Sequence, residues 1–301
     1  MVTRLTVFTP TYNRAHTLRR VYESLCTQTV CEGFEWLVID DGSTDFTRQL
    51  VEGFISEKRI PIRYIYKENG GLHTGYNTAY ANIDSELCVC IDSDDFMPDD
   101  AVELILKKWD SEGSSKYAGL VGLDYYLDSD TPIGGKLPDD MASCWLNELE
   151  TRGIHRGDMK QVMRTELMKE VAPQIGYPGE KNFNPVYMLL QVCDRLPLLV
   201  INRNLCYVDY QTGLDSMSER IFLQYLDSPR SFAKLRRLEM TLRHTSAVRR
   251  FRVAIHYVSS CIIARDRRWL ADSPKKLLTL LAAPAGYLLS RYIRHKAKQF
   301  T

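Results

Sequence analysis

The sequence lacks an apolar run long enough to cross a membrane. Its longest uncharged, apolar-rich run covers residues 277–290, which is 14 residues, and Pro284 and Gly286 interrupt it. A transmembrane helix needs ~20 such residues. The N-terminus also offers no secretory signal, because Leu5 and Val7 already fit a strand. We therefore expect a cytoplasmic protein without a spanning helix.

Cysteine pairs of the CxxC type are missing as well, which argues against a zinc ribbon and against a thioredoxin-like site. In a chain without a secretory signal, scattered cysteines are typical of reduced thiols in the core. The eight cysteines are Cys26, Cys31, Cys88, Cys90, Cys144, Cys193, Cys206 and Cys261.

Net charge is almost absent overall but is unevenly distributed. The 301 residues carry a net charge of +1, and a content of 45% hydrophobic and 26% charged residues is enough for a folded core. Residues 1–229 hold 22 Lys+Arg and 35 Asp+Glu, a balance of −13, whereas residues 230–301 hold 17 and 3, a balance of +14. A basic tail on an acidic body indicates an anionic partner: membrane phospholipid, nucleic acid or an acidic protein.

The first hundred residues alternate between strand and helix patterns. Near-continuous apolar strands in such an alternation indicate an α/β fold with a mostly parallel sheet and helices on both faces. Strands are predicted at 5–8, 35–39, 62–66 and 87–91, with helices around 18–25, 50–55 and 74–82. Further strands are predicted at 120–123 and 198–207, and the chain from about residue 219 onward fits basic, aromatic-rich helices.

Polar clusters follow three of these strands, at the edge where parallel sheets bind ligands. They are Thr9-Pro10-Thr11-Tyr12-Asn13-Arg14, Asp40-Asp41-Gly42-Ser43 and Asp92-Ser93-Asp94-Asp95. Asp92 and Asp94 can both face one Mg²⁺ or Mn²⁺, a hard cation that takes oxygen ligands and shares them with phosphates. The alternative is a solvated acidic turn that caps a helix starting near Pro98.

Two further groups suit a nucleoside. The carboxylate of Asp41 can accept a hydrogen bond from a nucleobase imide, although Asp, Gly and Ser are also the usual residues of a β-turn. The segment Asn69-Gly70-Gly71 supplies backbone that can approach a ligand closely. His73 and Asn77 follow it, four residues apart on one helix face. A plain tight turn is the alternative for the glycines.

In their order along the chain, these clusters resemble the motifs of family 2 glycosyltransferases of GT-A fold, of the bacterial surface-polysaccharide type. The resemblance is close over residues 3–100 and looser to about residue 210. It implies a GT-A nucleotide-sugar-binding and catalytic domain at residues 1–215 and a basic helical region at residues 216–301. It also implies a nucleotide-diphospho-sugar donor, usually UDP-linked, a divalent cation (Mn²⁺ or Mg²⁺), and inversion at the anomeric carbon.

The resemblance also implies roles for individual residues. Thr9, Thr11, Tyr12 and Asn13 would line the nucleoside pocket, and Asp41 would contact the base. Asp92 and Asp94 would be the acidic pair on the ribose and on the metal-bound diphosphate. The full set of predicted nucleotide-sugar contacts is Thr9, Thr11, Tyr12, Asn13, Asp41, Asn69, Gly70, Gly71, His73, Asn77, Asp92 and Ser93, with Asp92 and Asp94 as metal ligands.

Inversion in one step needs a general base that takes the proton of the acceptor hydroxyl. In many relatives this base belongs to a Gly-Glu-Asp-type segment, and the matching stretch here is Gly176-Tyr177-Pro178-Gly179-Glu180-Lys181. Glu180 is the predicted base, although Lys181 stands where an acid is common. Asp158 and Asp194 are the other candidates, and a surface Glu–Lys pair would explain the same segment.

Two other functions remain open. A sugar nucleotidyltransferase would also be α/β and metal-dependent, but it would need a Gly-rich phosphate loop with Lys or Arg after the first strand. A non-catalytic nucleotide-sugar-binding protein would not need the acidic pair. For the transferase, the expected acceptor is a glycan or a lipid-linked saccharide. We expect the basic tail to contact an anionic membrane surface at the inner face of the plasma membrane, and not nucleic acid. The alternative is that its apolar residues pack on the catalytic domain.

Overall fold

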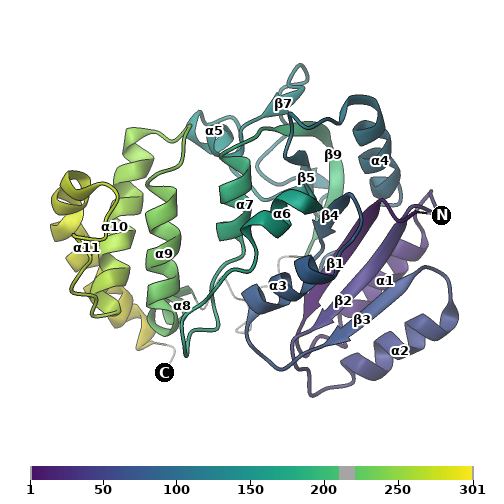
Figure 1. Cartoon of the computed structure of the whole chain (residues 1–301), viewed down its shortest axis with the longest axis horizontal. Helices are drawn as coiled ribbons and strands as arrows, with labels where there is room; N and C mark the ends of the chain where they lie inside the picture. The colour runs from purple at the N-terminus through teal and green to yellow at the C-terminus, as the bar shows by residue number, and fades with distance from the viewer. Residues whose placement is uncertain (1, 210–220, 300–301) are drawn as a thin grey trace. The chain divides into compact units, whose positions relative to one another are not determined.

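The computed structural model describes residues 2–209 and 221–299, and its contacts divide the chain into two compact units (Figure 1). Within the described residues, the first unit comprises 2–70, 74–173 and 192–209, and the second comprises 71–73, 174–191 and 221–299. The units are therefore interleaved along the chain. The predicted boundary between residues 215 and 216 lies outside the described residues and stays a prediction.

The first unit is built on one sheet, to which the described residues contribute nine strands in the order β3-β2-β1-β4-β8-β5-β9-β7, with β6 beside β5. The strands β1 to β4 are parallel, and β8 runs antiparallel to both β4 and β5. The bounds are β1 (Leu5–Thr11), β2 (Phe34–Asp40), β3 (Ile62–Tyr66), β4 (Leu87–Cys90), β5 (Gly119–Tyr126), β6 (Thr131–Pro132), β7 (Ser143–Cys144), β8 (Met159–Arg164) and β9 (Leu198–Val208). The predicted strands are confirmed in place and, for the first four, in direction.

Helices cover both faces of this sheet. Val7 of β1 pairs with Trp36 of β2, so their side chains share one face, where the Trp36 ring stacks on Tyr22 with 6.3 Å between centroids. Successive strand residues point to opposite faces, and Phe8 packs edge-to-face on Tyr76 on the other side, 5.2 Å away. The helices are α1 (Leu18–Cys26), α2 (Thr47–Glu57), α3 (Leu72–Asn82), α4 (Ala101–Glu112), α5 (Leu146–Thr151) and α6 (Thr165–Val171).

A large hydrophobic core packs the sheet of the first unit against α1, α2 and α4. It joins strand residues such as Val7 and Val38 to helix residues such as Leu25 and Ile105, all almost completely buried. Strands covered on both faces need apolar residues at successive positions, which is why β1 is buried along its whole length. The α/β fold expected from the sequence is confirmed.

The second unit is helical. Its helices are α7 (Val186–Cys193), α8 (Ile221–Asp227), α9 (Pro229–Glu239), α10 (Ala247–Ile263) and α11 (Lys276–Ala297). The buried face of α10, including Val253, Tyr257 and Val258, forms the centre of a core to which α9 and α11 contribute. The predicted C-terminal helical region is confirmed. Among the described residues, no helix is both long and apolar enough to span a membrane.

Candidate active site

Three loops meet at the carboxyl edge of the parallel strands. The register places Thr11 of β1 beside Asp40 of β2, and Phe8 of β1 beside Cys90 of β4. The backbone pairing continues past the strand ends, since the Asp41 N–H donates to the Thr11 carbonyl at 2.8 Å and the Ile91 N–H donates to the Phe8 carbonyl at 3.0 Å. Because β1 lies between β2 and β4, the polar clusters after all three strands are neighbours.

Asn13 ties the loop after β1 to the loop after β2. Its backbone is left-handed, with φ +53°, a conformation that Asn tolerates better than most residues. Its N–H donates to Ser43 Oγ at 2.9 Å, and its Oδ1 accepts the Thr44 N–H at 2.8 Å. The amide therefore shapes the two loops. Next to it, Tyr12 is 49% exposed, and the buried hydroxyl of Thr11 has no hydrogen-bond partner among the described residues.

Thr9 has a different position from the other residues of its motif. It is fully buried, and its Oγ1 accepts a hydrogen bond from Trp36 Nε1 at 3.0 Å. The Thr9 side chain therefore belongs to the core under α1 and α2, and only its backbone is available to the edge. Sequence spacing alone does not separate it from Thr11.

Asp41 organises the Asn-Gly segment. Its Oδ1 accepts the Gly70 N–H at 3.0 Å and contacts the ammonium of Lys67, and its carbonyl accepts Asn69 Nδ2 at 2.9 Å. Gly42 has φ +86°, and a Cβ there would lie 2.7 Å from the Asn69 nitrogen. Only glycine allows this approach. The structure thus brings Asp41, Asn69 and Gly70 together, as the sequence predicted them in one site.

Gly71 and His73 group with the second unit, whereas Asn77 lies in the first. A Cβ on Gly71, whose φ is +91°, would overlap the Lys181 carbonyl oxygen. The His73 ring is buried and lies 6.1 Å from the Phe183 ring, between centroids. Both residues are thus neighbours of the segment that contains Glu180.

Asp92, Ser93 and Asp94 directly follow β4. Asp92 is accessible to solvent, Asp94 is half-buried and Ser93 is buried. Protein atoms nevertheless crowd around Asp92, so desolvation raises its pKa, while Lys160 lowers it and the Asp94 charge raises it further. Such an accessible carboxylate with a raised pKa gains from a bound cation.

A buried ionic cluster that the sequence analysis missed supports the acidic pair. The ammonium of Lys160 on β8 lies 3.9 Å from Asp95 Oδ2 and 3.8 Å from Asp124 Oδ2, and all three side chains are buried. Burial raises the pKa of Asp95 to about 8 and that of Asp124 to about 6, with Lys160 opposing both shifts. The Asp124 and Asp95 charges raise the pKa of Lys160 against its desolvation.

A sequence signal for this cluster existed. Lys160 and Val162, two residues apart on β8, both occupy buried positions. Asp124 follows the apolar residues of β5. A charged residue at an inward strand position needs a partner. The identity of the partner could not be predicted, because β8 and β5 pair only in the folded sheet.

The donor atoms fit a hard divalent cation, although the protein supplies few of them. Among the described residues, no group of three or more His, Cys, Asp or Glu could hold a metal ion. Asp92 and Asp94 offer carboxylate oxygens, which Mg²⁺ and Mn²⁺ prefer, and such ions often take their remaining ligands from water and substrate phosphates. The predicted metal ligands are therefore chemically suitable only together with a phosphate ligand.

The three candidate bases differ in their surroundings. Glu180 caps α9, since its Oε1 accepts the Arg230 N–H at 3.0 Å and its Oε2 accepts the Ser231 N–H at 2.8 Å. Asp158 is exposed, and its charge raises the pKa of both Asp92 and Asp124. Asp194 follows α7 and raises the pKa of its neighbour Cys193.

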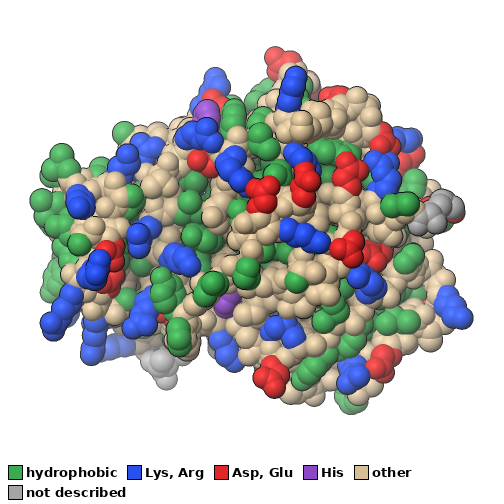
Figure 2. Space-filling model, viewed as in Figure 1, with side chains coloured by type: hydrophobic (Ala, Val, Ile, Leu, Met, Phe, Trp, Pro, Cys, Tyr) green, Lys and Arg blue, Asp and Glu red, His purple; other side chains and the backbone are tan. Residues whose placement is uncertain are grey.

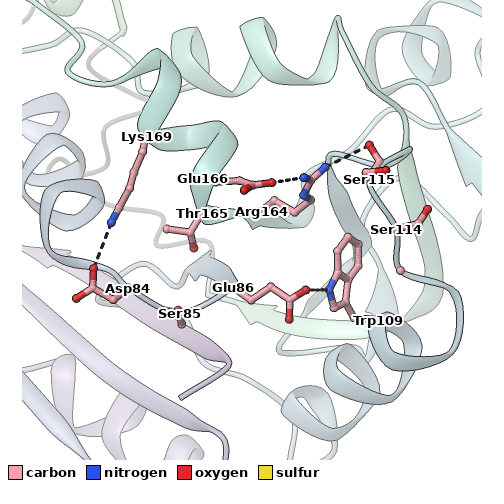
Figure 3. A pocket seen from close by; sticks show the side chains of 11 residues that line it. Asp84, Ser85, Glu86, Trp109, Ser114, Ser115, Arg164, Thr165, Glu166 and Lys169 are labelled. Atoms are coloured by element: carbon pink, nitrogen blue, oxygen red, sulfur yellow. Dashed lines mark hydrogen bonds and ion pairs between the residues drawn. The ribbon is translucent and has the colours of Figure 1, made fainter. Parts of the chain in front are cut away.

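A separate hollow lies at the opposite edge of the sheet (Figure 3). Asp84 and Glu86 precede β4, and Arg164 ends the antiparallel β8. The charges around it are already paired, because Lys169 Nζ lies 3.3 Å from Asp84 and Arg164 contacts Glu166. We therefore assign no ligand to this hollow.

Comparison with known proteins yields one family. Residues 6–130 match the model of glycosyl transferase family 2. The chain is 38% identical over 105 residues to the glycosyltransferase GlyA of Streptococcus pneumoniae and 45% identical over 78 residues to the validoxylamine A glucosyltransferase of Streptomyces hygroscopicus. These alignments cover 35% and 26% of this chain, and only 15% and 17% of the relatives.

Solved structures extend the likeness to the whole chain. The Staphylococcus aureus TarS fragment 1–349 with UDP-GlcNAc has a TM-score of 0.59 at 16% identity, covering 99% of this chain and 89% of that chain. The mannosyltransferase PcManGT of Pyrobaculum calidifontis, with GDP-Man and Mn²⁺, has a TM-score of 0.57 at 15% identity, covering 100% and 84%. At this identity the likeness establishes the GT-A fold.

Proposed function

We propose, on the premise that residues 6–130 match the glycosyl transferase family 2 model, that the chain is an inverting, metal-dependent transferase of hexosyl groups. The donor is a nucleotide-diphospho-sugar, most simply a UDP-sugar. The acceptor is a hydroxyl of a glycan or of a lipid-linked saccharide in surface-polysaccharide synthesis. The UDP-GlcNAc complex of TarS supports the choice of donor class.

One observation carries this proposal: the acidic pair lies where the polar loops after β1, β2 and β4 meet. Asp92 and Asp94 follow β4, and the loops of Asn13 and Asp41 follow the adjacent strands β1 and β2. The end of a parallel sheet is where a nucleotide is expected. In this arrangement the base and ribose lie over the β1 and β2 loops and the diphosphate lies at the acidic pair.

Asp92 and Asp94 would hold the cation, Mn²⁺ or Mg²⁺. When bound, the ion would neutralise negative charge on the departing diphosphate. The buried cluster behind the pair stabilises this arrangement, since the Lys160 ammonium compensates the Asp95 and Asp124 carboxylates. The Mn²⁺ in the PcManGT complex supports the assignment of a divalent cation.

Transfer requires one proton to leave the acceptor. The acceptor oxygen forms a bond to the anomeric carbon as the bond from that carbon to the diphosphate oxygen breaks, which inverts the configuration. A carboxylate takes the hydroxyl proton. Glu180 remains the proposed base from family resemblance, and Asp158 is the alternative whose charge acts directly on Asp92.

We also propose that the C-terminal region holds the protein on an anionic membrane. The apolar residues of α10, such as Tyr257 and Val258, do not serve this role, because they are buried in the core of the second unit. The apolar surface instead belongs to α11, where Leu277, Leu281 and Leu288 are 72%, 63% and 67% exposed. Figure 2 shows hydrophobic side chains gathered over α11 with Lys and Arg side chains near them.

Helix α11 places small residues inside and leucines outside, which is the reverse of a helix that packs its large apolar side chains into a core. It buries the small residues Thr279, Ala282 and Gly286, and it exposes leucines at i, i+4 and i+11. Gly286 lies so near α10 that a Cβ would be 2.6 Å from Val258. Lys275, Lys276, Arg291, Arg294 and Lys298 flank the exposed leucines. An apolar helix face with basic flanks lies in the plane of an anionic interface.

A panel of nucleotide sugars tests the proposed reaction. With Mn²⁺, the true donor should raise the melting temperature and should release its nucleoside diphosphate slowly without acceptor. EDTA should abolish both effects. Conversion of the nucleotide sugar and labelled diphosphate into labelled nucleoside triphosphate and sugar 1-phosphate would instead identify a nucleotidyltransferase. Binding without any hydrolysis would identify a non-catalytic binding protein.

A further inference from the structure

A basic pocket lies within the second unit, between α9 and the segment that follows α10. Its volume is about 460 Å³. The lining contains one carboxylate, Asp266, and six cationic side chains: Arg230, Lys234, Arg237, Arg265, Arg267 and Arg268. Like charges gathered around one hollow repel each other and attract anions.

The described part of the chain does not neutralise this pocket. Arg268 pairs with Asp272 at 3.1 Å, and the Asp266 carboxylate accepts the Arg268 N–H at 2.8 Å. The other four arginines have no ion pair with any Asp or Glu among residues 2–209 and 221–299; they are Arg230, Arg237, Arg265 and Arg267. Their guanidinium groups remain available to an anion.

The wall formed by α9 is held in place by contacts within the protein. Lys234 Nζ donates to the Ile175 carbonyl at 3.2 Å and lies 5.4 Å from the ring centroids of Phe183 and Tyr187. Burial, followed by the charge of Arg237, lowers the pKa of Lys234. A bound anion would relieve this repulsion between two cations of the same helix.

The other wall is the short segment after α10, and hydrogen bonds hold it in place. Arg265 has a left-handed backbone with φ +57°, which is unusual for a residue with a long side chain. The Asp266 N–H donates to the Cys261 carbonyl at 2.9 Å, and the Tyr257 hydroxyl donates to the Trp269 carbonyl at 2.7 Å. Strain held in place by its surroundings is common at ligand sites.

We propose that this pocket binds a phosphate or diphosphate group, either as a free anion or as the headgroup of a lipid-linked molecule. Arginine forks match pairs of phosphate oxygens, and the volume leaves room for a group attached to the diphosphate beside Tyr177. Binding here does not depend on the proposed sugar transfer. If the bound molecule is lipid-linked, its role as the acceptor would rest on the proposed sugar transfer.

Isothermal titration calorimetry of the full chain with inorganic diphosphate tests the site. The buffer contains EDTA, which removes metal-bridged binding at Asp92 and Asp94, and about 150 mM salt, which screens weak surface attraction. We expect saturable binding. The double variant Arg237→Gln/Arg267→Gln should weaken it at least about tenfold, whereas Arg252→Gln, an exposed arginine of α10 outside the pocket, should weaken it less than about twofold.

Equal weakening by both variants, binding unchanged in the double variant, or no saturable binding in the wild type would each overturn the proposal. All four arginines without ion pairs are exposed, so the variants should fold, and unchanged melting temperatures check this. Geranyl diphosphate and inorganic diphosphate distinguish the sources. Tighter binding of the geranyl compound identifies a lipid-linked group, and equal or weaker binding identifies a free anion. Loss of sugar transfer leaves these titrations unaffected.

Discussion

The ammonium of Lys160 lies 3.8 Å from Asp124 Oδ2, and both side chains are almost completely buried. Lys160 comes from β8 and Asp124 from β5, two antiparallel neighbours in the sheet. Lys160 also approaches Asp95, so a single cation lies near two acidic side chains beside the acidic pair. The charge balance at the sheet edge therefore depends on a residue outside every recognised motif.

Lys160→Met should destabilise the protein by about 3–5 kcal/mol, because it leaves the buried Asp124 carboxylate without a cation. Urea unfolding at neutral pH measures the effect. The matched control is Lys169→Met, which breaks the exposed pair with Asp84 and should cost less than about 1 kcal/mol. A similar loss in both variants would mean that the cluster is hydrated and contributes little.

The pKa of Asp124, raised by burial to about 6 from 3.8, predicts a pH dependence. Between these values the native state binds more protons than the unfolded state, so the free energy of unfolding should fall as the pH rises from about 4 to about 6. Asp124→Asn should make this part of the curve flatter. Urea midpoints at several pH values measure it, and an unchanged slope in the variant would contradict the assignment.

Asp94→Asn should remove most transferase activity and the metal-dependent part of donor binding while the fold stays intact. The reason is that a neutral amide is a poor ligand for a hard cation between the protein and a diphosphate. The control is Asp99→Asn, an exposed aspartate of the same segment that accepts a hydrogen bond from Thr27. If Asp94→Asn keeps a turnover near that of the wild type, Asp94 is not a metal ligand.

Glu180→Gln and Asp158→Asn distinguish the general bases. If Glu180 takes the proton, its variant should lose roughly 10²–10⁴-fold in kcat with donor affinity little changed. If Glu180 only caps α9, its variant should lower the melting temperature and change kcat less than about tenfold. Asp158→Asn should then show the large loss in kcat. Measuring kcat, donor Kd and melting temperature for both separates the two roles.

Membrane attachment through α11 predicts flotation with anionic liposomes that exceeds flotation with neutral ones at low salt. Replacing Leu277, Leu281 and Leu288 by Ser should abolish it, since each buried leucine contributes about 1.5–3 kcal/mol. The control replaces the exposed Phe46 and Val248, which are 76% and 75% exposed, by Ser. Equal flotation with both lipids, or none with the wild type, would leave α11 a structural helix.

The sequence by itself determined the strands of the first half of the sheet, their mostly parallel arrangement, and the polar clusters at the strand ends. Near-continuous apolar runs, ended by Asp, Gly or Asn, are local signals. For this reason Asp41, Asn69 and Gly70 could be predicted to lie close together, and they are hydrogen-bonded to one another; their role in ligand binding stays a prediction. The directions of β1 to β4 follow from the helices between them.

Only the tertiary structure decided which side chains act together across long separations. Lys160 meets Asp124 because β8 runs antiparallel to β5, and Glu180 meets α9 across 50 residues of sequence. Thr9 and Thr11 belong to one motif, yet the hydroxyl of Thr9 bonds to Trp36 in the core. Likewise, the sequences of α10 and α11 are both basic and rich in apolar residues. In the structure the apolar residues of α10 are buried, whereas Leu277, Leu281 and Leu288 of α11 are exposed. Burial depends on which neighbours a helix finds, and no local pattern contains that information.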